Sequence, residues 1–141
     1  KLAEVFYAVY HGKYGLQLIR QNDAWLQAAT PGDIIRLTDM LVKAVDEGAE
    51  FARLPGYSVA GKSGTAEIPE PYGYNPNETI AAFVGFAPAD DPRFVLLIRL
   101  DRPTVSPWGT QTAAPAFRAI AERLLVYMQV PPDDLRVSTD Q

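Results

Sequence analysis

The residues with the clearest chemical potential lie in the segment 56–65, which reads GYSVAGKSGT. Its first eight letters match G-x-x-x-x-G-K-[ST], the pattern of a phosphate-binding loop, in which a glycine-rich turn and a lysine hold phosphates where a helix begins. Its last four residues, Lys62, Ser63, Gly64 and Thr65, combine one positive charge with two hydroxyls around a glycine. On a β-strand, that combination can bind a carboxylate.

The surrounding sequence argues against phosphate binding. Pro55 stands where a central strand would have to enter the loop, and the residues after Ser63, GTAEIPEPYGYNPNE, contain glycines and prolines that are incompatible with a helix. No later acidic residue is evidently placed to hold magnesium. We therefore interpret the match to the phosphate-binding pattern as a coincidence.

A strand would instead turn Ser63 and Thr65 to one face, with their hydroxyls about 7 Å apart and room for one carboxylate between them. Gly64 leaves the backbone open to a ligand lying flat against the strand, and Lys62 adds a positive charge. Such an edge can also pair with an extended peptide. The structural alternative is that Lys62 is a solvated surface lysine and Gly64 a bulge, and the four residues alone do not decide between the two.

Hydrophobic periodicity predicts helices on both sides of this strand. Thr30 and Pro31 are typical of a helix start, and a buried face of Ile34, Leu37, Leu41 and Val45 runs toward a stop at Gly48. A second amphipathic helix is expected over 113–128, with Phe117, Ile120, Leu124 and Met128 at helical spacing. A short helix over 2–10 and a strand over 14–20 are weaker expectations.

Three strands are predicted, over 57–66, 79–87 and 93–101. The compact turn PADDP at 88–92 favours an antiparallel hairpin between the second and third strands. The minimal sheet is therefore antiparallel and three-stranded. The polar residues 133–141, which follow Pro131 and Pro132, are expected to form a flexible tail.

Composition argues against several classes of function. The chain has 141 residues and 48% hydrophobic content, which is typical of a soluble globular domain or of part of one. Its net charge is -4 and its basic residues are scattered, so we expect no nucleic-acid partner. There is no cysteine, and the single histidine, His11, lies in a polar loop without a second ligand nearby, so we expect no metal and no cofactor. No apolar run is long enough to span a bilayer, so any anchor would lie outside this chain.

Beyond these physical indications, the segment 59–67, VAGKSGTAE, resembles the strand that carries the third motif of the penicillin-recognising serine transpeptidases and β-lactamases. The resemblance continues through 81–94, AAFVGFAPADDPRF, which is similar to the next two strands of the class B penicillin-binding proteins. It extends to 113–117, AAPAF, which is similar to the start of their last helix. The specific similarity spans 30–132.

This resemblance implies an α+β fold, an antiparallel β-sheet flanked by helices, with residues 1–132 forming the C-terminal portion of a transpeptidase domain. The family also needs a Ser-x-x-Lys nucleophile and a Ser-x-Asn motif. Neither occurs around the four serines, Ser58, Ser63, Ser106 and Ser138. We therefore expect the nucleophile, the helical lobe and two further strands to lie upstream, and the strand near Val95 to lose a neighbour in their absence.

The implied reaction is acyl transfer, in which a serine elsewhere attacks the penultimate D-Ala carbonyl of a peptidoglycan stem peptide ending in D-Ala-D-Ala. By the resemblance, Lys62 supplies positive potential, the Ser63 and Thr65 hydroxyls hold the substrate carboxylate beside Gly64, and the Thr65 N–H is one of two oxyanion donors. β-Lactam antibiotics would occupy the same site. The parent enzyme would act in cell division or elongation on the extracytoplasmic face of the bacterial cytoplasmic membrane.

Two alternatives remain open at this point. One is a non-catalytic β-lactam-binding or sensor domain of the same fold, and the other is a fragment of a serine β-lactamase. A further expectation concerns the loop that contains Trp108, Gly109 and Thr110. It stands where the family often has a Gly-Gly pair, so we assign it no role in substrate binding, and Trp108 is expected to pack in the interior.

Overall fold

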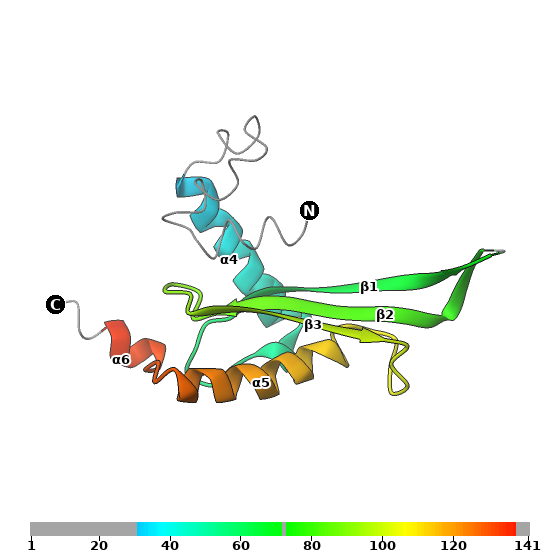
Figure 1. The fold of residues 1–141 in the computed structure, drawn as a ribbon. Helices are drawn as coiled ribbons and strands as arrows, with labels where there is room; N and C mark the ends of the chain where they lie inside the picture. The colour runs from blue at the N-terminus through cyan, green and yellow to red at the C-terminus, as the bar shows by residue number, and fades with distance from the viewer. Residues whose placement is uncertain (1–30, 72, 138–141) are drawn as a thin grey trace, which may run out of the picture.

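The computed structural model describes residues 31–71 and 73–137, so the helix and strand expected over 2–20 lie outside the described residues (Figure 1). The elements in chain order are α4 (Pro31–Gly48), η1 (Glu50–Ala52), β1 (Ala60–Glu70), β2 (Gly73–Ala87), β3 (Phe94–Asp101), α5 (Ala113–Tyr127) and α6 (Asp133–Val137). In Figure 1, α4 and α5 lie on opposite faces of the sheet. The predicted α+β architecture is confirmed. None of the helices in the described part of the chain is long and apolar enough to cross a membrane.

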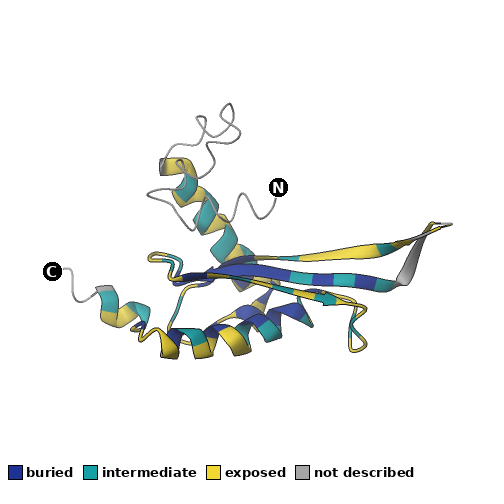
Figure 2. Ribbon diagram, in the orientation of Figure 1, coloured by how far each residue is buried: buried dark blue, intermediate teal, exposed yellow. Residues whose placement is uncertain are grey.

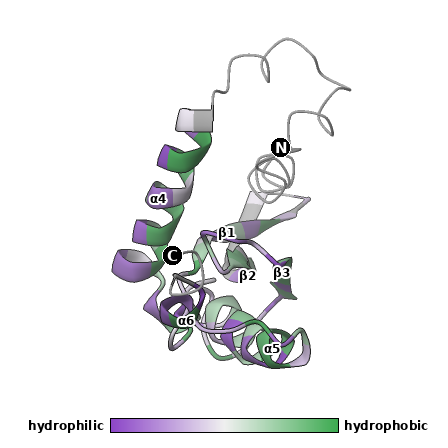
Figure 3. Cartoon of the chain, turned by 90° about the vertical axis from the view of Figure 1, so that its left-hand side faces the viewer, coloured by the Kyte–Doolittle hydropathy of each residue, from purple (hydrophilic) through white to green (hydrophobic). Residues whose placement is uncertain are grey.

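Helix α4 occupies the predicted range and carries Asp33 in its first turn, where an acid favours the helix dipole. Figure 3 shows an apolar stripe along the side of α4 that faces the strands. Leu37 and Leu41 from this stripe pack against Ala60, Val84 and Phe86 of the sheet. The helix therefore covers one sheet face next to the start of β1.

The sheet is antiparallel throughout, in the order β1-β2-β3. Strand β1 begins three residues later and ends four residues later than predicted, so the strand expected at 57–59 is wrong, and β2 begins six residues earlier than predicted. Both strands extend beyond β3 as a two-stranded ribbon (Figure 1). Prolines are tolerated in this ribbon because its strands have open edges, where a missing N–H breaks no ladder bond. Gly73 opens β2 with a φ of 138°, a conformation that suits glycine.

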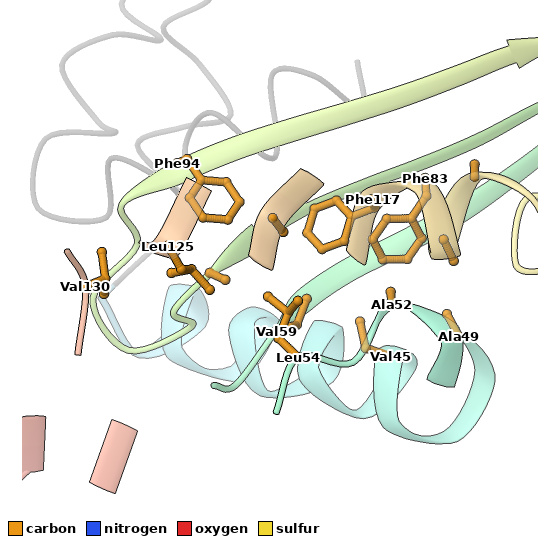
Figure 4. Packing of buried hydrophobic residues seen from close by; sticks show 14 residues of the cluster. Val45, Ala49, Ala52, Leu54, Val59, Phe83, Phe94, Phe117, Leu125 and Val130 are labelled. Carbon is orange, nitrogen blue, oxygen red and sulfur yellow. The ribbon is translucent and has the colours of Figure 1, made fainter. Parts of the chain in front are cut away.

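The main core lies between the sheet and α5. Phe83 of β2 and Phe117 of α5 are both fully buried, and their ring centroids are 4.8 Å apart (Figure 4). Figure 2 shows β2 as the most buried strand, between the more exposed β1 and β3. Burying two aromatic rings contributes several kcal/mol, and the tilted ring arrangement adds to it.

The predicted buried face of α5 is partly wrong. Phe117 is buried, but Ile120 and Met128 are 43% and 37% exposed. The helix instead buries the side made by Ala113, Ala114, Phe117, Ala121 and Leu125. Alanines let the helix approach the sheet closely. Because the prediction counted only the large apolar residues, it placed the buried face on a different side of the helix.

Strand β3 alternates between residues that are buried or half-buried on one face and residues that are exposed on the other. Leu96, Ile98 and Leu100 pack against the core under α5, whereas Leu97 on the opposite face is 59% exposed. Among the described residues, the outer edges of β1 and β3 have no partner strand. One face of β3 is therefore covered, and the other is open.

Residues 133–137 form the short helix α6, whose contacts the sequence did not suggest. The Asp133 amide donates to the Gly56 carbonyl (2.9 Å), and the Asp133 carboxylate accepts from the Ser58 amide and hydroxyl, both at 2.6 Å. Arg136 pairs with Asp90 in the β2–β3 turn. The flexibility expected for 133–141 stays a prediction, and residues 138–141 lie outside the described part.

The Asp90–Arg136 ion pair has a defined pH dependence. Desolvation by burial acts to raise the pKa of Asp90, but the hydrogen bond and charge from Arg136, with nearby amides, together hold that pKa below its usual value. A lowered folded-state pKa stabilises the fold above the unfolded value of about 3.9, and this stabilisation is lost as the pH falls through the folded-state pKa.

We therefore expect Asp90→Asn to reduce the free energy of unfolding by about 0.2–1 kcal/mol at neutral pH, the range for a mostly exposed pair. The difference from the wild type should vanish once the pH falls below the folded-state pKa of Asp90. Urea unfolding at a series of pH values measures it, with Asp91→Asn in the same turn as the control. A difference that stays constant with pH would show that the ion pair is not its cause.

Candidate functional site

Strand β1 distributes the four candidate residues over its two faces. Opposite partners share a face, and the register pairs Lys62 with Val84 and Ser63 with Phe83. Val84 packs on the α4 side, and Phe83 packs on the α5 side. Lys62 thus lies on the face toward α4, while Ser63 and Thr65 share the face toward α5, as strand alternation predicts.

The candidate residues are accessible at the outer edge of the sheet. Lys62, Gly64 and Thr65 are exposed, and Ser63 is half-buried. The Lys62 Nζ donates to the Ser63 carbonyl at 2.9 Å. Within residues 31–71 and 73–137, Lys62 forms no ion pair with an acidic side chain. Its charge is therefore not neutralised by a carboxylate of the described chain.

The two glycines flanking Lys62 and Ser63 differ in what the fold requires of them. A Cβ on Gly61 would lie 2.7 Å from the Phe83 Cζ and 2.9 Å from the Val84 carbonyl oxygen, whereas one on Gly64 would meet only the Ala82 Cβ, at 4.0 Å. Packing therefore demands Gly61 but not Gly64. The alternative of a bulge at Gly64 is wrong, because the β1–β2 register shifts only between Glu67 and Ile68.

One contact at this site was missed from the sequence. The Gly109 amide, in the loop between β3 and α5, donates to the Thr65 Oγ1 at 3.1 Å. The expectation that Trp108 packs in the interior is wrong, since Trp108 is 56% exposed. Its carbonyl accepts from the Gln111 amide and from the Thr112 amide and hydroxyl, and this turn leaves the indole ring outside.

Other features of the described chain offer less chemistry. An open hollow of about 710 Å³ lies between α4 and α6, lined by Val42, Leu54 and Leu135 among others, and it includes none of the four candidate residues. Residues 31–71 and 73–137 contain no group of acids and histidines that could hold a metal ion. We therefore place the candidate site at the exposed edge of β1.

Comparison with known proteins identifies the class. The family described as the penicillin binding protein transpeptidase domain matches residues 24–122. A probable peptidoglycan D,D-transpeptidase, PbpC of Pseudomonas aeruginosa, is 40% identical over 128 residues, covering 87% of this chain and 23% of that protein. The peptidoglycan D,D-transpeptidase FtsI of Escherichia coli K12 is 35% identical over 109 residues, covering 74% of this chain and 18% of that protein.

Solved structures agree with this assignment. The apo transpeptidase domain of Burkholderia pseudomallei penicillin-binding protein 3 superposes with a TM-score of 0.67 at 36% identity, covering 74% of this chain and 32% of that chain. Penicillin-binding protein 3 of Mycobacterium tuberculosis, solved with ampicillin, gives a TM-score of 0.67 at 31% identity, covering 76% of this chain and 26% of that chain.

The chain therefore belongs to the transpeptidase-domain family of the penicillin-binding proteins. It matches this family in both sequence and fold, as the resemblance of the β1 segment implied. The chain spans about a quarter of the length of the curated relatives it matches, 23% for one and 25% for another.

The contrast between the two glycines gives a direct prediction. Gly61→Ala should lower the free energy of unfolding by about 1–3 kcal/mol, because its Cβ would overpack the core beside Phe83. Gly64→Ala should change it by less than about 0.5 kcal/mol. Urea unfolding of both variants measures this. Equal losses would mean that β1 does not hold the described register.

Proposed function

We propose that this chain supplies the substrate-binding strand of a peptidoglycan D,D-transpeptidase, an enzyme that cross-links stem peptides by serine acyl transfer and binds penicillin. The observation that carries this proposal is the Lys-Ser-Gly-Thr segment at an open sheet edge, in a chain that belongs to the penicillin-binding protein family. The named relatives are peptidoglycan D,D-transpeptidases, which supports the reaction class.

The substrate carboxylate would bind along β1. The Ser63 and Thr65 hydroxyls can both donate to it, and the Lys62 ammonium attracts it electrostatically. A strand residue turns its N–H and C=O to the same side, and residues two apart repeat that direction. Because Lys62 reaches the Ser63 carbonyl from the exposed side, the same geometry turns the Thr65 N–H toward the open edge. That amide is our proposed oxyanion donor.

The chemical step needs a serine that this chain does not provide. In the proposed reaction, the serine Oγ attacks the penultimate D-Ala carbonyl, the bond to the terminal D-Ala breaks, and the acyl group then passes to an amine of a neighbouring stem peptide. The Thr65 N–H stabilises the negative oxygen of the tetrahedral intermediate. The same serine would attack the ring amide of a β-lactam and open the ring. One relative of this fold, penicillin-binding protein 3 of Mycobacterium tuberculosis, was solved with ampicillin and with aztreonam.

The remainder of the transpeptidase domain is the expected polypeptide partner. We propose that residues 1–132 form the C-terminal portion of that domain and that further strands continue the sheet beyond β3. The unpaired edge of β3 and the exposed Val95 and Leu97 support this, because an apolar strand at a bare edge invites pairing. We also place the parent protein on the extracytoplasmic side of the bacterial membrane, anchored outside this chain, in cell division or elongation.

The role of Lys62 can be measured in the polypeptide that joins this chain to its Ser-x-x-Lys lobe. Lys62→Gln should slow acylation by a fluorescent penicillin by about 100-fold to 1,000-fold, the cost of removing one electrostatic contact in an active site. Lys43→Gln, at an exposed lysine on α4, is the matched control and should leave the rate unchanged.

Three outcomes would contradict the proposal. Equal acylation of the wild type and Lys62→Gln would remove Lys62 from the site. Rapid release of the acyl group as hydrolysed penicillin would indicate a β-lactamase. A stable adduct without cross-linking of stem peptides would likewise indicate a sensor domain, because the acyl group would never reach an amine.

A further inference from the structure

The loop between β3 and α5 reaches the candidate site through one backbone group. The Gly109 amide donates to the Thr65 Oγ1 at 3.1 Å, although the two residues are 44 positions apart in the chain. Gly109 is buried, whereas Thr65 is exposed. A buried residue of the loop therefore donates a hydrogen bond to the hydroxyl of an exposed residue on β1.

This contact determines what the Thr65 hydroxyl can still do. A hydroxyl has one hydrogen to donate and two lone pairs that accept. The Gly109 amide occupies a lone pair, and among residues 31–71 and 73–137 no protein group accepts the hydrogen. The hydroxyl can therefore donate to an external acceptor. A carboxylate accepts only, and an accepted bond makes the hydroxyl a stronger donor.

The fold holds the Gly109 amide firmly in this position. A Cβ on Gly109 would lie 2.4 Å from the Ala82 carbonyl oxygen and 2.5 Å from the Gly64 carbonyl oxygen, so only glycine fits. Two residues before Gly109, the Pro107 carbonyl accepts from the buried Thr79 hydroxyl at 2.9 Å. The Gly109 carbonyl accepts from the Ala114 amide in the first turn of α5, also at 2.9 Å.

We propose that Gly109 is a positioning residue for carboxylate recognition: its amide orients the Thr65 hydroxyl so that the hydroxyl hydrogen points to the bound carboxylate. This inference rests on the proposed function. It extends that function by one residue, Gly109, which acts on the substrate only through Thr65. It also explains why a loop without a side chain at this position approaches β1 so closely.

A double-mutant cycle tests this in the polypeptide that joins the chain to its Ser-x-x-Lys lobe, with penicillin acylation rates as the readout. Thr65→Val and Gly109→Ala should each slow acylation by about tenfold to 100-fold, as expected for a hydrogen bond to a charged group. In the T65V background, Gly109→Ala should cost less than about twofold, because the hydroxyl it orients is absent. Gly48→Ala, where the Cβ meets nothing within 4 Å, is the glycine control.

A second variant covers the case in which Gly109→Ala disturbs the loop. Replacing Gly109 with glycolate turns the Trp108–Gly109 amide into an ester, which removes the N–H without adding a side chain and weakens the Trp108 carbonyl as an acceptor for Gln111 and Thr112. This variant should reproduce the loss of rate and the coupling to Thr65. Equal losses in both backgrounds would overturn the positioning role alone. A wild-type enzyme that forms no penicillin adduct would overturn the proposed function and this inference with it.

Discussion

The candidate site depends on the register between β1 and β2. Side chains alternate along a strand, so a slip by one residue would exchange the face of Lys62 with the face of the two hydroxyls. Gly61 prevents this slip, because it lies against the Phe83 ring and the Val84 carbonyl and leaves no room for a side chain. The glycine before the lysine thus secures the register, and the glycine after Ser63 leaves space for a ligand.

The helices hold β2 in place, and β2 holds β1. Phe83 and Phe117 join the sheet to α5, while Val84 and Phe86 on the opposite face meet α4. Because β2 is covered on both faces, it is the rigid strand on which the exposed β1 is built. At the start of β1, Asp133 of α6 binds the Ser58 amide and hydroxyl. The accessible edge is therefore carried by a buried framework, which is the arrangement that binding sites need.

Local signals in the sequence were sufficient for α4, α5, the β2–β3 hairpin and strand β1, but not for α6. The start and stop residues of α4 act within a few positions, and the PADDP turn encodes the antiparallel return of β3. Contacts between residues far apart in the sequence could not be predicted from such local signals. The Asp133–Ser58 bonds span 75 positions, and no periodicity in either segment reports them. The close approach of α5 to the sheet also depends on alanines. Their small volume favours this approach only when the sheet surface opposite them is known, so the sequence alone did not predict it.

The residue types of the candidate site could be predicted from the sequence, but the contacts that hold these residues in place could not. The Lys-Ser-Gly-Thr segment is contiguous, so the sequence was sufficient to propose its chemistry. The Gly109 contact could not be predicted in this way, because its donor is a backbone amide and no side chain indicates it. The one sign of the contact in the sequence is the glycine at this position. Trp108 was misplaced for a related reason: its hydrophobicity favours burial, but the hydrogen bonds to its carbonyl turn the ring outward.

In the proposed enzyme, this chain provides the carboxylate-binding strand and the nucleophile lies on another part of the polypeptide. Intact mass after incubation with penicillin, measured on the chain alone and on the polypeptide that includes its Ser-x-x-Lys lobe, distinguishes this arrangement from a nucleophile within the chain. We expect an unchanged mass for the chain and one penicilloyl adduct on the longer polypeptide, at a serine outside these 141 residues. An adduct on Ser58, Ser63, Ser106 or Ser138 would contradict it.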